Sequence, residues 1–335
     1  MILASRLLLH RGVRRGLLLL LSSLVVTPAL AQTPPGQVPG TPDAQPPQEQ
    51  AVFKAGVEVV TVTATVRDRK GRLVKGLTSQ DFEVFDAGER RAIMDFRSEP
   101  TAVSVAILFD ISGSMRVANA ALAAKFAAHH VLSWLEPGRD EAALFTFDSR
   151  LEEVASFTVD TRALQGALGE VDPFGATSLH DAVAEAAQRV DARKGRRAIV
   201  VITDGLDTHS RLTPAQVSGI ASAIDVPVYV IATVMPIDHP GRNGPVEQVL
   251  PTTAGTVEDL ANWTGGAFFY TSAPSDTSKA ARQVIEELRQ QYIIAFEPAK
   301  ASGWRSLEVK MRDKALSVRT RSGYLAGDAV LNNGH

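Results

Sequence analysis

The chain has 335 residues, of which 45% are hydrophobic and 21% are charged. At about 150 residues per domain this length allows roughly two domains, and the composition excludes a wholly disordered or fibrous protein. The 35 Lys and Arg residues nearly balance the 37 Asp and Glu residues, so the formal net charge is −2. No overall positive field therefore attracts nucleic acid or an anionic membrane surface.

The N-terminal segment, residues 1–31, has the order of a secretory signal peptide. Four arginines precede a mostly apolar run over 17–26, and an Ala-Leu-Ala triplet at 29–31 predicts cleavage before Gln32. The run has about half of the roughly 20 residues that a membrane-spanning helix needs, which favours processing over anchoring. We expect an exported protein, periplasmic or extracellular, with no stable membrane span after signal removal. Cysteine is absent, so export brings no disulfides.

A linker and a first β segment follow the predicted signal. Residues 32–52 are rich in proline and glutamine and cannot bury enough apolar surface to offset the entropy of ordering, so they predict a disordered tether. From Val60 to Val66 apolar residues alternate with threonines, the period of a half-buried strand, and a second alternating run begins at Phe82. Residues 53–100 therefore predict the first part of a small β module.

After Pro100 the pattern changes to apolar runs of strand length separated by amphipathic helices. This alternation is typical of a parallel sheet with crossover helices. The predicted strands are 103–109, 142–147, 198–203, 228–232 and 267–270. We expect residues 101–292 to form an α/β domain with a doubly wound, mostly parallel sheet flanked by helices.

Three of the predicted helices carry an apolar face, with residues spaced three or four apart. The expected faces are Ala118, Leu122, Phe126, His129 and Leu132 in the first helix, Leu179, Val183, Ala187 and Val190 in the second, and Ala281, Val284 and Leu288 in the last. On the first face we expect His129 to be a hydrogen-bonded core histidine and not a metal ligand.

The two-residue period returns in residues 293–326, for example from Leu307 to Met311. Isolated hairpins are marginally stable in water, so we expect 53–100 and 293–326 to pair into one small β sandwich. The α/β domain is then inserted between the two parts of the sandwich. Residues 327–335 remain as a C-terminal tail.

Acidic and hydroxyl residues follow two of the predicted buried strands. The segment 110–114 (Asp-Ile-Ser-Gly-Ser) comes after the first strand, Asp204 comes after the third, and Thr177 lies between them in sequence. The carboxyl ends of strands in an open α/β sheet are where ligands bind, so we expect these segments to converge on one edge. Each segment alone is consistent with helix capping, and Ser178 with Asp181 matches a capping box.

Together the segments supply two carboxylates and three hydroxyls, all hard oxygen donors suited to Mg²⁺ or Ca²⁺. Their order, Asp-x-Ser-x-Ser, then Gly-x-Thr-Ser-Leu, then a hydrophobic strand ending in Thr-Asp-Gly, resembles the metal-ion-dependent adhesion site of a von Willebrand factor A domain. The resemblance covers roughly residues 101–292, and the flanking sequence resembles exported bacterial proteins built around such a domain. It implies a divalent ion, Mg²⁺ or alternatively Mn²⁺ or Ca²⁺, held by Asp110, Ser112, Ser114, Thr177 and Asp204.

The resemblance implies a non-enzymatic binding protein. An ion held largely by neutral hydroxyls keeps an exchangeable position that an Asp or Glu carboxylate of a protein partner can occupy. The long connection over 234–245 leaves the end of a strand, and we hypothesise that it forms part of the partner surface. A disordered insertion is the alternative, because loops tolerate added length. An assembly scaffold in which the metal only stabilises the loops is the main alternative.

A metal-dependent phosphohydrolase using Asp110 and Asp204 is the third possibility. It lacks an identifiable base or nucleophile, so we assign no catalytic residue. Asp207 and His209 are expected to be surface loop residues, and no Gly-x-Ser-x-Gly elbow surrounds the serines.

Overall fold

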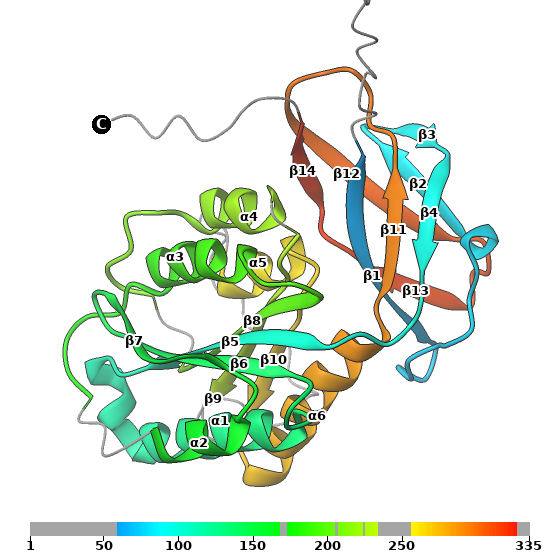
Figure 1. The fold of residues 1–335 in the computed structure, drawn as a ribbon. Coiled ribbons are helices and arrows are strands. Elements are labelled where there is room, and N and C mark those ends of the chain that lie inside the picture. Colours follow the sequence, from blue (N-terminus) through cyan, green and yellow to red (C-terminus); the bar gives the residue numbers. More distant parts are fainter. Residues whose placement is uncertain (1–58, 168–172, 205–206, 224, 234–255, 327–335) are drawn as a thin grey trace, which may run out of the picture. The chain divides into compact units, whose positions relative to one another are not determined.

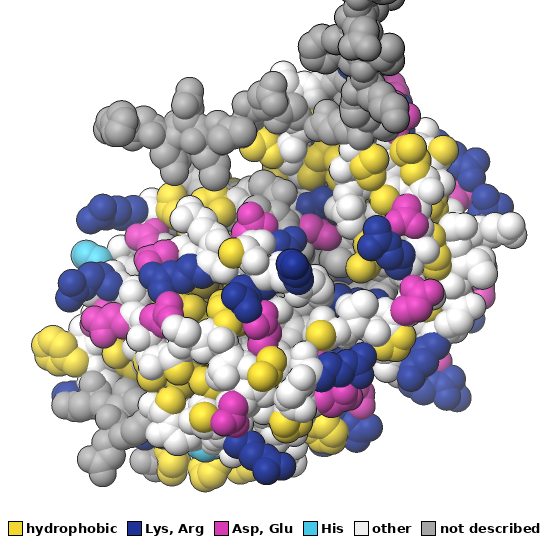
Figure 2. All heavy atoms as spheres, in the orientation of Figure 1, with side chains coloured by type: hydrophobic (Ala, Val, Ile, Leu, Met, Phe, Trp, Pro, Cys, Tyr) yellow, Lys and Arg dark blue, Asp and Glu magenta, His cyan; other side chains and the backbone are white. Residues whose placement is uncertain are grey.

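The computed structural model describes residues 59–167, 173–204, 207–223, 225–233 and 256–326. The predicted signal peptide over 1–31, the linker over 32–52, the tail over 327–335 and the hypothesised partner loop over 234–245 lie outside the described residues. On the face drawn in Figure 2, basic and acidic side chains are interspersed, in keeping with the small net charge.

A six-stranded sheet forms the centre of the α/β domain (Figure 1). Its order is β10-β9-β8-β5-β6-β7, with β5 Val103–Asp110, β6 Glu141–Phe147, β7 Leu151–Thr158, β8 Arg196–Thr203, β9 Val228–Thr233 and β10 Phe268–Thr271. All pairs are parallel except β6 with β7. The predicted mostly parallel sheet is therefore confirmed. The antiparallel strand β7 was not predicted, because it is half exposed and carries no continuous apolar run.

Helices cover both faces of this sheet. Figure 1 shows α3, α4 and α5 on one side and α1, α2 and α6 on the other; their bounds are α1 Ala120–Trp134, α2 Thr161–Ala167, α3 Leu179–Asp191, α4 Pro214–Ala223, α5 Val257–Trp263 and α6 Pro274–Gln290. Val105 and Ile107 of β5 belong to one core cluster, and Ala106 and Leu108 belong to the other. A strand buried on both faces needs apolar residues at every position, which explains the continuous apolar runs. No helix in the described part of the chain has the length and apolar character to cross a bilayer.

The predicted apolar face of α1 is wrong at Leu122 and Phe126 but correct at Leu132, whereas the predicted faces of α3 and α6 are confirmed. The side chains of Leu122 and Phe126 are 52% and 50% exposed, and His129 is only half-buried. The buried side is instead formed by Ala124, Ala127, Ala128, Val131 and Leu132. Small alanines let the helix lie close to the sheet. Because alanine is only weakly apolar, the sequence pattern did not reveal that the alanine-rich side is the buried one.

Two four-stranded antiparallel sheets come from the flanking segments, as the sandwich prediction requires. The first has the order β13-β1-β11-β4, with β1 Val60–Asp68, β4 Ile93–Arg97, β11 Tyr292–Phe296 and β13 Leu316–Arg319. The second has the order β14-β12-β2-β3, with β2 Phe82–Asp86, β3 Glu89–Arg91, β12 Gly303–Met311 and β14 Gly323–Ala326. Val62, Ala64 and Val66 of β1 are buried in their shared core, so the two-residue period reports the inward face correctly.

A buried acid connects α6 to the first of these sheets. The fully buried Glu287 forms ion pairs with Arg67 of β1 and Arg319 of β13, and it accepts a hydrogen bond from Gln283 at 3.2 Å. A buried carboxylate is stable only when it is paired and hydrogen-bonded. Glu287 therefore makes the end of α6 dependent on the flanking strands.

Candidate metal-ion site

Asp110 is the last residue of β5, at the carboxyl edge of the six-stranded sheet, and it is fully buried. One carboxylate oxygen, Oδ1, accepts a hydrogen bond from the backbone N–H of Ser112 at 2.8 Å. The other, Oδ2, accepts from the hydroxyl of Thr203 at 2.6 Å. Thr203 ends the neighbouring parallel strand β8, so sheet pairing holds this carboxylate in place.

The electrostatic surroundings of Asp110 disfavour an isolated negative charge. Burial raises the pKa of Asp110 to about 6, although hydrogen bonds from Ser112 and Thr203 oppose the shift, and the nearby charge of Asp204 raises the pKa further. A buried carboxylate with a second carboxylate beside it needs a nearby positive charge to be stable in the ionised form. The pair therefore fits a cation.

Hydroxyl groups surround this carboxylate pair. The Oγ atoms of Ser112 and Ser114 lie 3.0 Å apart, with Ser114 in the short 3₁₀ helix Gly113–Asn119 that follows β5. Ser112 is buried, whereas Ser114 and Asp204 are partly exposed. The cluster can therefore be reached from solvent.

Thr177 is brought to the same region by backbone contacts between two loops. The N–H of Phe174 donates to the carbonyl of Ile111 at 2.8 Å, and the N–H of Gly113 donates to the carbonyl of Gly175 at 3.0 Å. A Cβ on Gly113 would lie 3.2 Å from that carbonyl oxygen, a tight contact that would push the two loops slightly apart, so glycine favours this close approach. The segment 110–114 and the loop before Thr177 are consequently fixed against each other.

A third loop, after β8, holds the backbone of Thr177. Its carbonyl accepts hydrogen bonds from the N–H groups of Thr208 and His209, both at 2.9 Å. Its N–H donates to the Thr208 hydroxyl at 3.0 Å. Both backbone groups of Thr177 are thus satisfied, and its side chain is buried.

The predicted capping box at the start of α3 is wrong. The Ser178 side chain makes no capping hydrogen bond, and the Asp181 carboxylate accepts from the N–H groups of Arg211 and Leu212 instead. The first N–H groups of α3 are capped by the loop after β8. Leu179 N–H donates to Asp207 Oδ1 at 2.8 Å, and the N–H groups of residues 180 and 181 donate to Ser210 Oγ.

The sequence predicted that Asp207 is a surface loop residue. The structure shows that its side chain instead holds the start of α3 in place. Its Oδ2 lies 3.1 Å from Nδ1 of the buried His180, and its Oδ1 accepts from the Ser210 hydroxyl at 2.7 Å. Burial raises the pKa of Asp207, but the hydrogen bonds from His180 and Ser210 outweigh it and hold the pKa below its usual value. No local sequence pattern predicts this role, because Asp207 lies 28 residues after Leu179, the helix residue whose N–H it accepts. His209 is exposed, as expected.

The sequence-predicted donors thus fall into three groups. Asp110, Ser112 and Ser114 are directly linked, Asp204 interacts electrostatically with Asp110, and Thr177 is tied to them through the backbone. Within the described residues no three His, Cys, Asp or Glu side chains gather in a metal-binding cluster, since this site has only two carboxylates. Two carboxylates with three hydroxyls fit a hard divalent cation.

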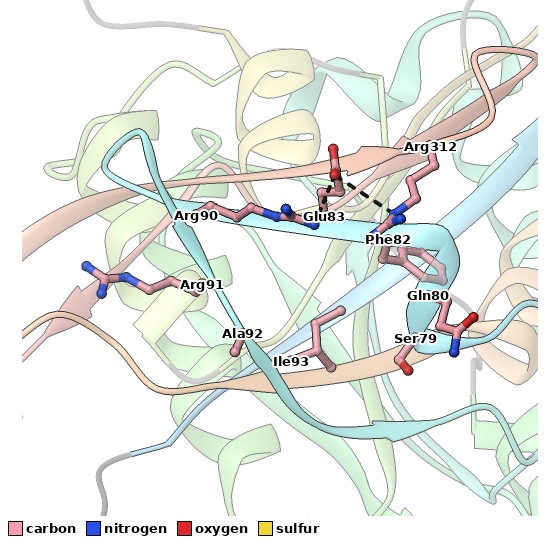
Figure 3. Close-up of a pocket in the computed structure, with 9 residues that line it drawn as sticks. All are labelled: Ser79, Gln80, Phe82, Glu83, Arg90, Arg91, Ala92, Ile93 and Arg312. Atoms are coloured by element: carbon pink, nitrogen blue, oxygen red, sulfur yellow. Dashed lines mark ion pairs between the residues drawn. The ribbon is translucent and has the colours of Figure 1, made fainter.

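A cavity of about 460 Å³ is lined entirely by sandwich residues and is a weaker candidate (Figure 3). Glu83 lies between two arginines there, 3.1 Å from Arg90 and 3.9 Å from Arg312. Because these charges already compensate one another, the cavity presents no unpaired acid for a cation, and we retain the edge of the six-stranded sheet as the candidate site.

Comparisons with known proteins give one family match and several similar solved structures. Residues 105–206 match the sequence profile of the von Willebrand factor type A domain, and no curated protein matches the chain. BatB from Bacteroides thetaiotaomicron is 20% identical, with 56% of this chain and 98% of that one aligned at a TM-score of 0.44. A von Willebrand factor type A protein from Catenulispora acidiphila is 13% identical over 82% and 76% of the two chains, with a TM-score of 0.44.

Proximal thread matrix protein 1 from the mussel byssus, in a structure with a zinc-occupied MIDAS motif, is 16% identical. The alignment covers 60% of this chain and 48% of that one at a TM-score of 0.42. The assignment of the domain depends on the match over 105–206, which contains α3, β8 and all of β5 after its first two residues.

Proposed function

Since residues 105–206 match the von Willebrand factor type A domain, we propose that the chain is an exported, non-enzymatic binding protein built around such a domain. Its site would hold a divalent ion, Mg²⁺ or alternatively Mn²⁺ or Ca²⁺, through Asp110, Ser112, Ser114, Thr177 and Asp204. The ion would receive an Asp or Glu carboxylate of a protein partner. The observation that carries the proposal is the buried Asp110–Ser112 pair, with the partly exposed Ser114 and Asp204 beside it.

Each residue has a separate task in this proposal. Asp110 supplies negative charge at a position fixed by two strands, while the hydroxyls of Ser112, Ser114 and Thr177 supply neutral oxygens. When bound, the ion would supply an electrophilic position, because the two carboxylates only balance its charge of +2 and the other three donors are neutral hydroxyls. The buried side of the site excludes water and strengthens the attraction between this position and a partner's carboxylate.

Export is proposed from the N-terminal segment alone, since residues 1–31 have the order of a signal peptide. The mature protein would act in the periplasm or outside the cell. Fractionation of cells that express the full chain tests this point. Detection of a mature N-terminus at Gln32 in the periplasm or medium supports export, and retention of the full-length chain in the cytoplasm contradicts it.

A Mn²⁺ titration of the full chain, followed by calorimetry or by electron paramagnetic resonance, tests the metal site. We expect Asp110→Asn and Ser112→Ala to weaken Mn²⁺ binding at least about tenfold, because a ligand is removed. Asp95→Asn, which removes an exposed carboxylate in β4 of the sandwich, is the matched control and should bind Mn²⁺ like the wild type. Equal binding by all variants would place the metal elsewhere.

Partner capture separates the remaining alternatives. The proposal requires that a chelator and Asp110→Asn both abolish capture while circular dichroism shows an intact fold. A scaffold would lose thermal stability on chelation but keep its partners. A phosphohydrolase would turn over p-nitrophenyl phosphate with Mg²⁺, a reaction that the binding proposal excludes.

A further inference from the structure

Phe174 exposes 73% of its side chain, more than any other large hydrophobic residue in the described part of the chain. Single exposed apolar residues are common on protein surfaces, so exposure alone assigns no role. The position of Phe174 distinguishes it, because it belongs to the loop that leads to Thr177 and contacts the segment 110–114.

The backbone at Phe174 is hydrogen-bonded to the segment 110–114 of the candidate site. Its N–H donates to the Ile111 carbonyl at 2.8 Å, and one residue later the Gly175 carbonyl accepts from Gly113 at 3.0 Å. Ile111 and Gly113 alternate with the three donors Asp110, Ser112 and Ser114. Two hydrogen bonds therefore join the aromatic residue to the same five-residue segment that carries most of the proposed ligands.

This arrangement resembles the energetic centre of many interfaces. Aromatic side chains contribute large contact areas at a small entropy cost, particularly when the backbone beneath them is already fixed. Aromatic residues, including phenylalanine, are enriched in the cores of protein interfaces. A partner whose carboxylate approached the site would bring its neighbouring groups towards this exposed ring.

We propose that Phe174 is a specificity-determining residue, which selects acidic ligands that carry an apolar group next to the carboxylate-bearing residue. The inference rests on the proposed function and narrows its partner class from any exposed Asp or Glu to an acidic residue with a hydrophobic neighbour. A contact that removes about 50 Å² of apolar surface from water corresponds to roughly a tenfold gain in affinity.

Capped tripeptides with a central aspartate test the inference on the full chain loaded with Mn²⁺. One peptide has glycine on both sides of the aspartate, and two others have phenylalanine on one side only. Titration calorimetry or paramagnetic relaxation gives the dissociation constants. We expect at least one phenylalanine peptide to bind wild-type protein about tenfold more tightly than the glycine peptide, and chelation to abolish binding of all three.

The variant Phe174→Ala should remove this preference without altering the affinity for Mn²⁺ or for the glycine peptide. Its side chain is exposed, so the fold should persist. Trp304→Ala, which removes a half-exposed aromatic residue of β12 in the sandwich, should keep the preference. A preference that survives Phe174→Ala, or equal binding of all peptides to the wild type, overturns the role of Phe174 alone. Failure of every peptide to bind the Mn²⁺-loaded protein overturns the proposed function as well.

Discussion

Replacement of Asp207 tests whether the loop after β8 stabilises the fold and positions the candidate metal ligands. This carboxylate accepts hydrogen bonds from the Leu179 N–H and the Ser210 hydroxyl and pairs with Nδ1 of His180. In Asp207→Ala all three partners lose their acceptor. We expect both a lower free energy of unfolding and weaker metal binding, because the same loop also holds the backbone of Thr177.

The size of the effect follows from the groups left without partners. Loss of a helix N-cap costs about 1 kcal/mol, and loss of a hydrogen bond to a charged group costs about 1.5–3 kcal/mol. Since only 16% of the Asp207 side chain is exposed, solvent replaces these contacts poorly. We therefore expect Asp207→Ala to lower the free energy of unfolding by about 2–4 kcal/mol. Asp207→Asn, which keeps an oxygen acceptor but removes the charge, should fall between Ala and the wild type.

Urea denaturation followed by circular dichroism measures the free energy of unfolding, and the Mn²⁺ titration measures the affinity for the metal. Groups that orient metal ligands typically change affinity by 10–100-fold, and Asp207 acts one step further away, so we expect up to about a tenfold loss. Asp191→Ala is the matched control, because it removes an exposed aspartate, paired with Arg197, at the other end of α3. If Asp207→Ala and Asp191→Ala had the same free energy of unfolding, the contacts of Asp207 would not stabilise the protein.

Four further predictions concern the fold and the site. Glu287→Ala should lower the free energy of unfolding by about 3–5 kcal/mol in urea denaturation, because it leaves two arginines without their buried partner. Ser112→Ala should weaken Mn²⁺ binding yet leave the free energy of unfolding in urea within about 1 kcal/mol of the wild type, and a large loss of stability would show a structural role instead. Phe126→Ser on the exposed side of α1 should be nearly neutral in thermal denaturation, whereas Ala128→Leu on the buried side should cost about 1–3 kcal/mol; the reverse order would restore the face predicted from sequence. Burial raises the pKa of Asp86, but hydrogen bonds from Arg305 and the Ala299 N–H outweigh it and lower the pKa below the ordinary 3.8. The stability that Asp86 contributes is therefore complete above pH 3.8 and is lost as the pH falls through its lowered value, so Asp86→Asn should flatten the acid limb of a stability-against-pH curve.

The candidate site is assembled mainly by backbone contacts between loops. Gly113 approaches Gly175, and the Thr177 backbone is held by the loop after β8. These backbone hydrogen bonds position the proposed hydroxyl ligands but do not involve their side chains. Substitutions of those side chains should therefore weaken metal binding more than they destabilise the fold.

The sequence by itself determined the architecture, because burial on both faces of a sheet imposes continuous apolar runs and burial on one face imposes a period of two. Both patterns are local, so the sequence alone predicts β5 and β1 and also the segments that carry Asp110 and Asp204. Tertiary structure alone decided which side of α1 is buried, because Ala128 packs against the sheet while the larger Phe126 faces solvent. It also decided that Asp207, and not Ser178, caps α3, since a cap supplied from another loop depends on a contact in space that no spacing along the chain encodes.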